Sequence, residues 1–304
     1  MKRDFTKLLD INSEECLYLL GRAGELKRMR KEGRGYQPLI GRHLAMIFEK
    51  ASTRTRISFE VGMNDLGGKA VLLNKGDTQI GRGEPARDTA RVLSRYVDAI
   101  MIRTYAQDIV EELARWAEVP VINGLTDIYH PCQILSDLFT IWEKKGDVRD
   151  LRIAYIGDGN NMANSWIEAS ILLNLRFTMA TPVGYEPLPH LLSMAERNCN
   201  FRLFHDPFGA VKDADVINTD VWVSMGQEKE EMERRRAFTS FKIDRELLKA
   251  AREDAIVLHC LPAHRGEEIS EDVFEGFQDV IFTQAENRLH VQKALLEWLM
   301  LNRG

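Results

Sequence analysis

The segment most suggestive of chemistry is Ser52-Thr53-Arg54-Thr55-Arg56, which places three hydroxyl groups and two guanidinium groups in five consecutive residues. It lies between an apolar run, Leu44–Phe48, and an amphipathic pattern, Arg54–Leu66. A hydroxyl residue there caps the helix, and the free N–H groups of the first turn favour an anion. A guanidinium adds a planar fork of donors suited to phosphate. The segment predicts a phosphate site, although a plain Ser/Thr cap beside two surface arginines also fits these residues.

The common glycine-rich nucleotide motifs are incomplete. The segment at residue 52 lacks the glycines and the Gly-Lys-Ser/Thr ending of a P-loop. The turn Gly157-Asp158-Gly159-Asn160-Asn161 has two glycines of a dinucleotide fingerprint, but Met162 stands where the third belongs. The end of the next expected strand, Phe177–Thr181, offers no acidic residue to a ribose. These features argue against a nicotinamide site, while the turn still exposes Asn160 and Asn161.

Four further polar clusters could carry chemistry, and each has an ordinary alternative. They are His130-Pro131-Cys132-Gln133, Asp220 to Gly226, His259-Cys260-Leu261-Pro262 and Glu286-Asn287-Arg288. The histidine and glutamine of the first cluster, three residues apart, can face one point, or they can be a cap and a solvated amide. The second cluster can meet an amine and a carboxylate, or it is a plain polar loop. Cys260 is a reactive thiol or a small buried side chain, and Arg288 reaches a cleft or solvent.

The clusters must be positioned by an alternation of short apolar runs and longer amphipathic stretches. Strands are expected at Leu44–Phe48, Ala70–Leu73, Ala99–Ile102, Val119–Ile122, Arg152–Ile156, Phe177–Ala180, Phe201–Phe204, Asp215–Asn218, Ala255–Leu258 and Val280–Phe282. Helices are expected at Arg54–Leu66, Ala86–Tyr96, Gln107–Ala117, Pro131–Lys144, Met162–Leu173, Leu188–Asn198 and Gln284–Leu301. This alternation is typical of an α/β protein in which helices flank mainly parallel sheets.

Every cluster falls at the carboxyl end of an expected strand or at the start of the next helix, where open α/β sheets bind ligands. The charged stretch Lys144 to Asp147, with its glycine, indicates a boundary between two domains, residues 1–146 and 147–284. The last helix, within 285–304, is expected to pack back onto the first domain. If the binding edges of both domains face each other, the active site lies in the interdomain cleft.

Composition excludes several classes of protein. The chain has 304 residues, 44% of them hydrophobic and 29% charged, with a formal net charge of −5. This balance gives no reason to expect nucleic acid or a membrane as partner. The N-terminus has no apolar signal region, and no stretch approaches the roughly 18 to 20 apolar residues of a membrane span. The highly charged stretch Gly226–Arg236 is expected to be a solvated loop or helix face.

The cysteines do not form a disulfide or zinc framework. Cys16, Cys132, Cys199 and Cys260 lie far apart and form no Cys-x-x-Cys pair. His259, Cys260 and His264 fit no usual zinc spacing, and no second cluster completes four ligands. We therefore expect a cytoplasmic protein without a metal site.

Taken together, the segments resemble the carbamoyltransferase family along nearly the whole chain. The run Ser52 to Arg56 resembles the family's carbamoyl-phosphate signature, and His130 to Gln133 resembles its second motif. Asp220 with Ser224-Met225-Gly226, and His259 to Pro262, resemble the ornithine branch. One departure is Ala51, where many relatives have proline; it affects the stiffness of the loop rather than a ligand.

The resemblance implies a reaction and a set of residue roles. A carbamoyl group would move from carbamoyl phosphate to the side-chain amine of L-ornithine, giving L-citrulline and phosphate, with no cofactor. The resemblance assigns carbamoyl phosphate to Ser52, Thr53, Arg54, Thr55, Gln79, Arg103, His130, Gln133, Cys260, Leu261 and Arg288. It assigns ornithine to Asn161, Asp220, Ser224 and Met225, and catalysis to Arg103, His130, Asp220 and Cys260. It also implies a homotrimer or a multiple of trimers.

Two rival functions remain open on the sequence. One is a carbamoyltransferase for another amine or amino acid, such as putrescine or aspartate, against which the Ser224-Met225-Gly226 loop and Cys260 argue. The other is a non-catalytic binding protein on the same fold, which would be marked by loss of Arg54, Arg103, His130 or Gln133; all four are present.

Overall fold

The computed structural model describes residues 2–74, 76, 83–198, 200–224, 226 and 228–301. The chain forms two compact units, Met1–Phe139 with Glu286–Gly304 and Thr140–Ala285. The divisions fall inside two helices, α5 (Pro131–Lys145) and α12 (Gln278–Leu301). Gln79 and Met225 lie outside the described residues.

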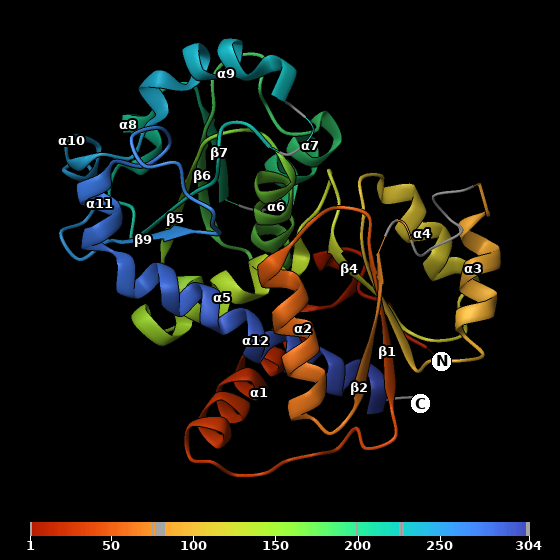
Figure 1. Cartoon of the computed structure of the whole chain (residues 1–304). Helices are drawn as coiled ribbons and strands as arrows, with labels where there is room; N and C mark the ends of the chain where they lie inside the picture. Colours follow the sequence, from red (N-terminus) through yellow and green to blue (C-terminus); the bar gives the residue numbers. More distant parts are fainter. Residues whose placement is uncertain are drawn as a thin grey trace. The chain divides into compact units, whose positions relative to one another are not determined.

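The first unit is built on a parallel sheet of four strands in the order β2-β1-β3-β4. Figure 1 labels three of these strands, β1, β2 and β4. The strands are β1 (His43–Phe48), β2 (Lys69–Asn74), β3 (Ala99–Arg103) and β4 (Val121–Leu125). β4 begins two residues later than expected and directly follows Pro120, which has no N–H to donate. The N-terminal segment extends this edge, because Phe5 N–H donates to the Val121 carbonyl at 2.8 Å.

Helices connect and cover these strands as βαβ units require. They are α1 (Ser13–Lys31), α2 (Thr53–Asp65), α3 (Ala86–Leu93) and α4 (Gln107–Trp116), with a 3-10 turn at Leu8–Asp10. The long helix α1 was not expected from the sequence. On one face of the sheet, Ile47 and Ile100 pack with residues of α3 and α4 such as Ala90 and Val110. Alternate residues of the central strands thus anchor that pair of helices.

The second unit holds a parallel sheet of five strands in the order β7-β6-β5-β8-β9. The strands are β5 (Arg152–Ile156), β6 (Arg176–Ala180), β7 (Asn200–Phe204), β8 (Val216–Thr219) and β9 (Ile256–His259). Its helices are α6 (Asn161–Leu173), α7 (Pro189–Asn198), α8 (Pro207–Val211), α9 (Glu231–Phe238), α10 (Arg245–Leu248) and α11 (Glu271–Gly276). Short 3-10 turns lie at Val148–Asp150, Glu228–Glu230 and Thr239–Phe241.

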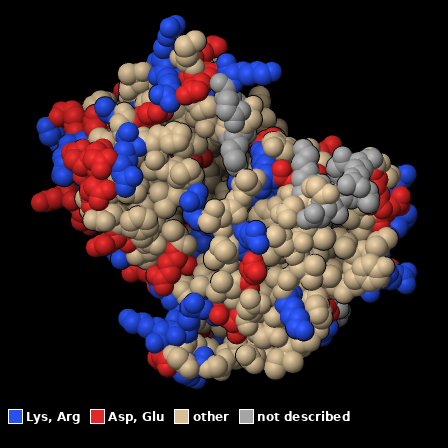
Figure 2. Space-filling view, in the orientation of Figure 1, with Lys and Arg blue, Asp and Glu red and all other residues tan. Residues whose placement is uncertain are grey.

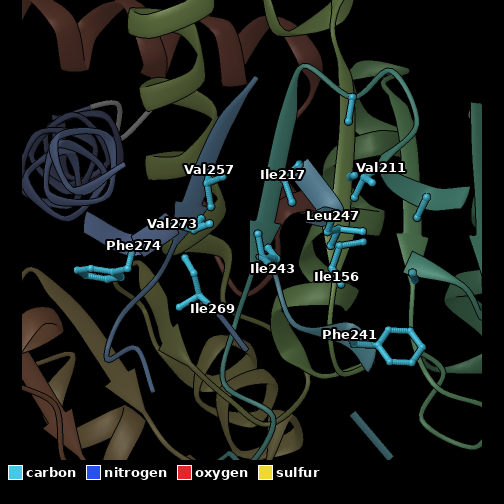
Figure 3. Close-up of a cluster of buried hydrophobic side chains, with 14 of the residues drawn as sticks. Ile156, Val211, Ile217, Phe241, Ile243, Leu247, Val257, Ile269, Val273 and Phe274 are labelled. Carbon is cyan, nitrogen blue, oxygen red and sulfur yellow. The ribbon is translucent and has the colours of Figure 1, made fainter. Parts of the chain in front are cut away.

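The core of the second unit forms where three neighbouring strands meet the short helices (Figure 3). Ile156, Ile217 and Val257 come from β5, β8 and β9 and are fully buried. Leu247 and Val273, from α10 and α11, pack against them. Burying such side chains stabilises the folded state by roughly 1.5 to 3 kcal/mol each. The sheet edge that carries the polar clusters is therefore held on a tightly packed base.

One expected strand is wrong. Val280–Phe282 belongs to helix α12, which begins at Gln278 rather than at Gln284. Ile281, Gln284 and Arg288 are buried while Phe282 is 52% exposed, a spacing that matches a helix and not an alternating strand. A short apolar run does not distinguish the two structures by pattern alone.

The surface of α9 agrees with the solvated helix face expected for Gly226–Arg236. Met232 is 76% exposed, and Glu231, Glu233, Arg235 and Arg236 are also exposed. Basic and acidic side chains intermingle on the face that Figure 2 shows. Arg234 is the exception, because it is buried. Among the described residues no helix is both long and apolar enough to cross a membrane.

Candidate active site

The phosphate segment forms the start of α2, as the sequence predicts. Ser52 is the N-cap, in extended conformation, and its hydroxyl accepts from Thr55 N–H at 3.1 Å. Thr55 is fully buried in the first turn, whereas Arg54 is half-buried. This helix end combines backbone donors with the positive end of the helix dipole.

Thr55 joins two buried guanidinium groups from distant parts of the first unit. Its hydroxyl oxygen accepts from Arg288 Nη2 at 2.9 Å and from Arg103 Nη1 at 3.3 Å. Arg288 Nη1 also donates to Gln133 Oε1 at 2.6 Å and lies 3.4 Å from His130 Nε2. The four side chains that the sequence could only place near strand ends thus form one cluster around Thr55.

The electrostatics of this cluster are strongly positive. Burial lowers the pKa of His130 well below its ordinary value, and Arg288, Arg103 and Arg54 lower it further. His130 is therefore neutral at physiological pH and acts as a hydrogen-bonding group rather than a cation. Arg103 is only 7% exposed and Arg288 only 3%. Such a concentration of buried cations suits a group that carries negative charge.

Topology explains why these residues meet. In the first sheet the chain runs from β1 outward to β2, and from β3 outward to β4 on the other side. The reversal lies between β1 and β3, where Phe48 pairs with Arg103 and the α2 segment follows β1. The second sheet reverses between β5 and β8, where Ile156 pairs with Thr219 and Asp220 follows. Ligands of open α/β sheets bind at such crevices.

Asp220 is the centre of the second unit's cluster. Its Oδ2 accepts from Asn160 Nδ2 at 3.0 Å, and its Oδ1 accepts from Cys260 Sγ at 3.0 Å and from Val221 N–H at 2.8 Å. Asn160 also caps α6, accepting from Met162 and Ala163 N–H groups. The carboxylate is 7% exposed. It is therefore held in place by groups from three different strand ends.

The loop after β9 is held by a buried histidine. Leu261 N–H donates to His259 Nδ1 at 2.9 Å, so the neutral ring carries its proton on Nε2, which lies 2.9 Å from Glu268 Oε1. His259 and Glu268 are both buried. Leu261 has a φ of 60°, a conformation that an L residue keeps only when its surroundings impose it. The pair thus fixes the backbone that presents Cys260 and Leu261.

The glycine-rich turn has a packing explanation. A Cβ added to Gly159 would lie 2.4 Å from backbone atoms of Tyr185, Glu186 and Pro187. Gly159 N–H also donates to the Tyr185 carbonyl at 2.9 Å. Glycine is therefore required at position 159 because the backbone of residues 185–187 lies too close for a side chain. This packing explains the glycine without a bound pyrophosphate.

A group with possible metal-binding atoms was not expected from the sequence. Within the described ranges, His264, Glu267 and Glu268 have ligand atoms within 4.8 Å of one another. Their carboxylates have protein partners: Glu268 binds His259 and the His264 backbone, and Glu267 pairs with Arg235 at 2.9 Å. The geometry is explained by these internal contacts.

Sequence reasoning missed several buried polar residues near the clusters. Lys50 is 5% exposed, contacts Asp127 and lies 4.3 Å from the Tyr105 ring. Arg234 pairs with Asp158 at 2.9 Å. Lys50 lies two residues before Ser52, so its place beside the phosphate segment could have marked it as a site residue. In the charged run 228–236, by contrast, nothing in the sequence distinguishes Arg234 from its neighbours.

The structure brings most of the expected site residues into two sets, one in each unit. Ser52, Thr55, Arg103, His130, Gln133 and Arg288 form the first set, and Asp220 and Cys260 lie in hydrogen-bond contact in the second. Thr53 begins α2, Asn161 begins α6, and Ser224 follows in the loop after Asp220. Leu261 stands beside Cys260. Gln79 and Met225 are outside the described residues, and the ligand roles of all these residues stay predictions.

Comparisons with known proteins agree along the whole chain. The carbamoyl-P binding domain model of aspartate/ornithine carbamoyltransferase matches residues 3–143, and the Asp/Orn binding domain model matches residues 149–299. An ornithine carbamoyltransferase of Syntrophotalea carbinolica is 52% identical over 301 residues, 99% of this chain and 100% of that protein. The solved structure of ornithine carbamoyltransferase from Pyrococcus furiosus is 52% identical with a TM-score of 0.96, covering 100% of this chain and 98% of that one. An anabolic ornithine carbamoyltransferase structure from Campylobacter jejuni is 44% identical with a TM-score of 0.93, covering all of both chains.

Proposed function

Since the chain belongs to the aspartate/ornithine carbamoyltransferase family, we propose that it transfers the carbamoyl group of carbamoyl phosphate to the side-chain amine of L-ornithine. The products are L-citrulline and phosphate. The observation that carries the proposal is the cluster in which Arg103 and Arg288 both donate to Thr55 at the N-terminus of α2. We take ornithine as the acceptor amine because the chain is similar over its full length to ornithine carbamoyltransferases.

Carbamoyl phosphate is assigned to the first unit. The phosphate oxygens accept from the helix end at Ser52, Thr53, Arg54 and Thr55, where cations and backbone donors are concentrated. Arg103 bridges the phosphate and the carbonyl oxygen, and Gln133 and Arg288 contact the carbamoyl group. What supports this assignment is that the buried Arg103 and Arg288 both donate to Thr55, and that Arg288 also donates to Gln133.

Ornithine is assigned to the second unit. Asn161, Asp220, Ser224 and Met225 bind its α-amino and carboxylate ends, and Cys260 and Leu261 lie toward the reacting end. The free amine has a pKa of about 10.4, so productive binding must favour its neutral form, because an ammonium has no lone pair. Asp220, a buried carboxylate in contact with the Cys260 thiol, is the candidate to accept the proton that the ammonium group must lose.

The reaction then needs no covalent bond between the enzyme and either substrate. The amine nitrogen attacks the carbonyl carbon, the bond from that carbon to the phosphate oxygen breaks, and the proton that the nitrogen loses goes to the departing phosphate. Negative charge develops on the carbonyl oxygen, where Thr55, Arg103 and neutral His130 act as donors. Phosphate departs toward the cations that held it. The protein accelerates the reaction by positioning the two substrates and by stabilising the charge on the carbonyl oxygen.

Several expectations from the sequence belong to the same proposal. Gln79 adds a further contact to carbamoyl phosphate, and the active form is a cytoplasmic homotrimer or a multiple of trimers. The domain limits at residues 146 and 284, and the interdomain cleft, also stay predictions. Light scattering during size-exclusion chromatography tests the assembly, and a monomer that retains full activity would contradict it.

The deciding experiment measures citrulline and phosphate formed by the purified protein from carbamoyl phosphate. Ornithine, putrescine and aspartate are compared as acceptors at equal concentration. Citrulline formation with ornithine strongly preferred is expected. Transfer only to another amine would keep the phosphate site and remove the ornithine assignment, and no transfer to any acceptor would favour a binding protein.

A further inference from the structure

One charged residue of helix α9 is buried, although the charged residues beside it are exposed. The Arg234 side chain is 9% exposed, and its partner Asp158 is 6% exposed. Arg234 Nη1 donates to Asp158 Oδ2 at 2.9 Å and to the Trp222 carbonyl at 3.4 Å, and Nε donates to Glu230 Oε2 at 2.9 Å. Its guanidinium carbon also lies 5.1 Å from the centre of the Tyr185 ring.

These contacts connect the two loops that follow β5 and β8. Asp158 lies in the turn after β5, two residues before Asn160, and Trp222 lies two residues after Asp220. Asn160 and Asp220 are themselves joined by a hydrogen bond of 3.0 Å. The turn and the loop are therefore tied twice, once between these two polar side chains and once through Arg234.

Aromatic packing holds the same region from the apolar side. Phe238, one turn after Arg234 on α9, is fully buried. Its ring lies 4.9 Å from that of Tyr185 and 6.1 Å from that of Trp222, measured between centroids. Helix α9 is thus attached to the loop after β8 by one apolar and one charged side chain.

A buried ion pair is a poor means of gaining stability, because removing two charges from water offsets most of their attraction. It is an effective means of fixing geometry, since a guanidinium makes several hydrogen bonds in fixed directions. Lysine in place of Arg234 could keep the charge but not the full set of contacts.

We propose that Arg234 and Asp158 are positioning residues for ornithine: their ion pair fixes the loop after β8, which carries Ser224, relative to the turn after β5, which carries Asn161. Neither side chain touches the reacting atoms. This inference rests on the proposed function, because ornithine is the ligand whose contacts the pair arranges.

The kinetic test uses Asp158→Asn, Arg234→Gln and the double variant, with Arg236→Gln as a matched control on the exposed side of α9. The ornithine KM is expected to rise about ten-fold in each single variant and no further in the double variant, since one coupled contact is lost in all three. The carbamoyl phosphate KM and the Arg236→Gln enzyme should stay within about two-fold of the natural protein. The proposal would be overturned if the rise in ornithine KM in the double variant equalled the product of the rises in the two single variants. It would also be overturned if the carbamoyl phosphate KM rose as much as the ornithine KM.

Two additions keep the result decisive. Arg234→Lys replaces Arg234→Gln if the latter does not fold, and an ornithine KM identical to that of the natural protein in Arg234→Lys contradicts a need for the guanidinium. Hydrogen exchange at Trp222 to Ser224 needs no catalysis, so it separates this inference from the proposed function. Faster exchange in Asp158→Asn and Arg234→Gln than in Arg236→Gln supports the proposal, and unchanged exchange refutes it.

Discussion

At the scale of single residues, Thr55 has the contacts that make a sharp test possible. Its buried hydroxyl accepts hydrogen bonds from both Arg103 and Arg288. Thr55→Val keeps the shape and removes the acceptor, which leaves two buried cations less well placed. We expect kcat/KM to fall about 10²-fold, the effect typical of losing one aligned polar group in a catalytic site.

The matched variant is Thr55→Ser, which retains the hydroxyl and loses one methyl group. Steady-state kinetics with both substrates varied should find it close to the natural protein, within about five-fold. Equal losses in Thr55→Ser and Thr55→Val would show that packing rather than the hydroxyl matters at this position.

Cys260 gives a second prediction at this scale. Its thiol donates to Asp220, so Cys260→Ala removes a partner of the carboxylate, whereas Cys260→Ser keeps a donor. We expect Cys260→Ala to raise the ornithine KM about ten-fold, with a smaller rise in Cys260→Ser. Binding of carbamoyl phosphate, followed by calorimetry, should change less than ornithine use. The same ornithine KM in both variants as in the natural protein would remove the thiol from the mechanism.

At the scale of elements, the approach of α2 to α12 places Thr55 near Arg288. Gly62 lies at this approach: a Cβ added there would be 3.2 Å from Lys293 Cγ and 3.5 Å from Leu289 Cδ1. Gly62→Ala needs a shift of a few tenths of an ångström in a flexible side chain and gains about 1 kcal/mol of helix propensity, so it should be tolerated.

Gly62→Leu has no such space and should push the two helices apart. We expect a fall in kcat/KM of more than about ten-fold, because the bond of 2.9 Å from Arg288 to Thr55 depends on that spacing. Kinetics and thermal unfolding of both variants check this. Full activity in Gly62→Leu would mean that the site does not depend on the helix contact.

Elements are also the scale at which sequence prediction succeeded best. Apolar runs bounded by polar turns located nine strands, and the pattern is strongest in central strands such as β1, β3 and β5, which are buried on both faces of their parallel sheets. Val280–Phe282 failed because three apolar residues fit a buried helix equally well. The family resemblance assigned Arg103, Arg288 and Thr55 to one ligand, but the motifs by themselves did not predict that both guanidinium groups donate to the Thr55 hydroxyl, since strand order decides which segments meet. Arg234 was missed because burial of one arginine among several is decided by tertiary contacts alone.

At the scale of the whole molecule, the Asp158–Arg234 pair links the site to the pH dependence of stability. Burial raises the pKa of Asp158 to about 6; Asp220 adds to the rise, while Arg234 and the Gly159 N–H oppose it. Between the ordinary pKa of 3.8 and about pH 6, the folded protein therefore keeps a proton on Asp158 that the unfolded chain has released. Holding this proton stabilises the folded protein; the stabilisation is full below pH 3.8 and is lost as pH rises through about 6.

The variant Asp158→Asn has no carboxyl group at this position and cannot titrate there. Its free energy of unfolding, relative to that of the natural protein, should therefore increase by about 1 kcal/mol between pH 5 and pH 8. Denaturant unfolding of the two proteins at both pH values measures this difference. Together with a higher ornithine KM, the expected result would mean that the ionised pair is kept at neutral pH for the geometry it imposes; a relative loss of stability in Asp158→Asn toward pH 8 would instead make the pair a contributor to stability.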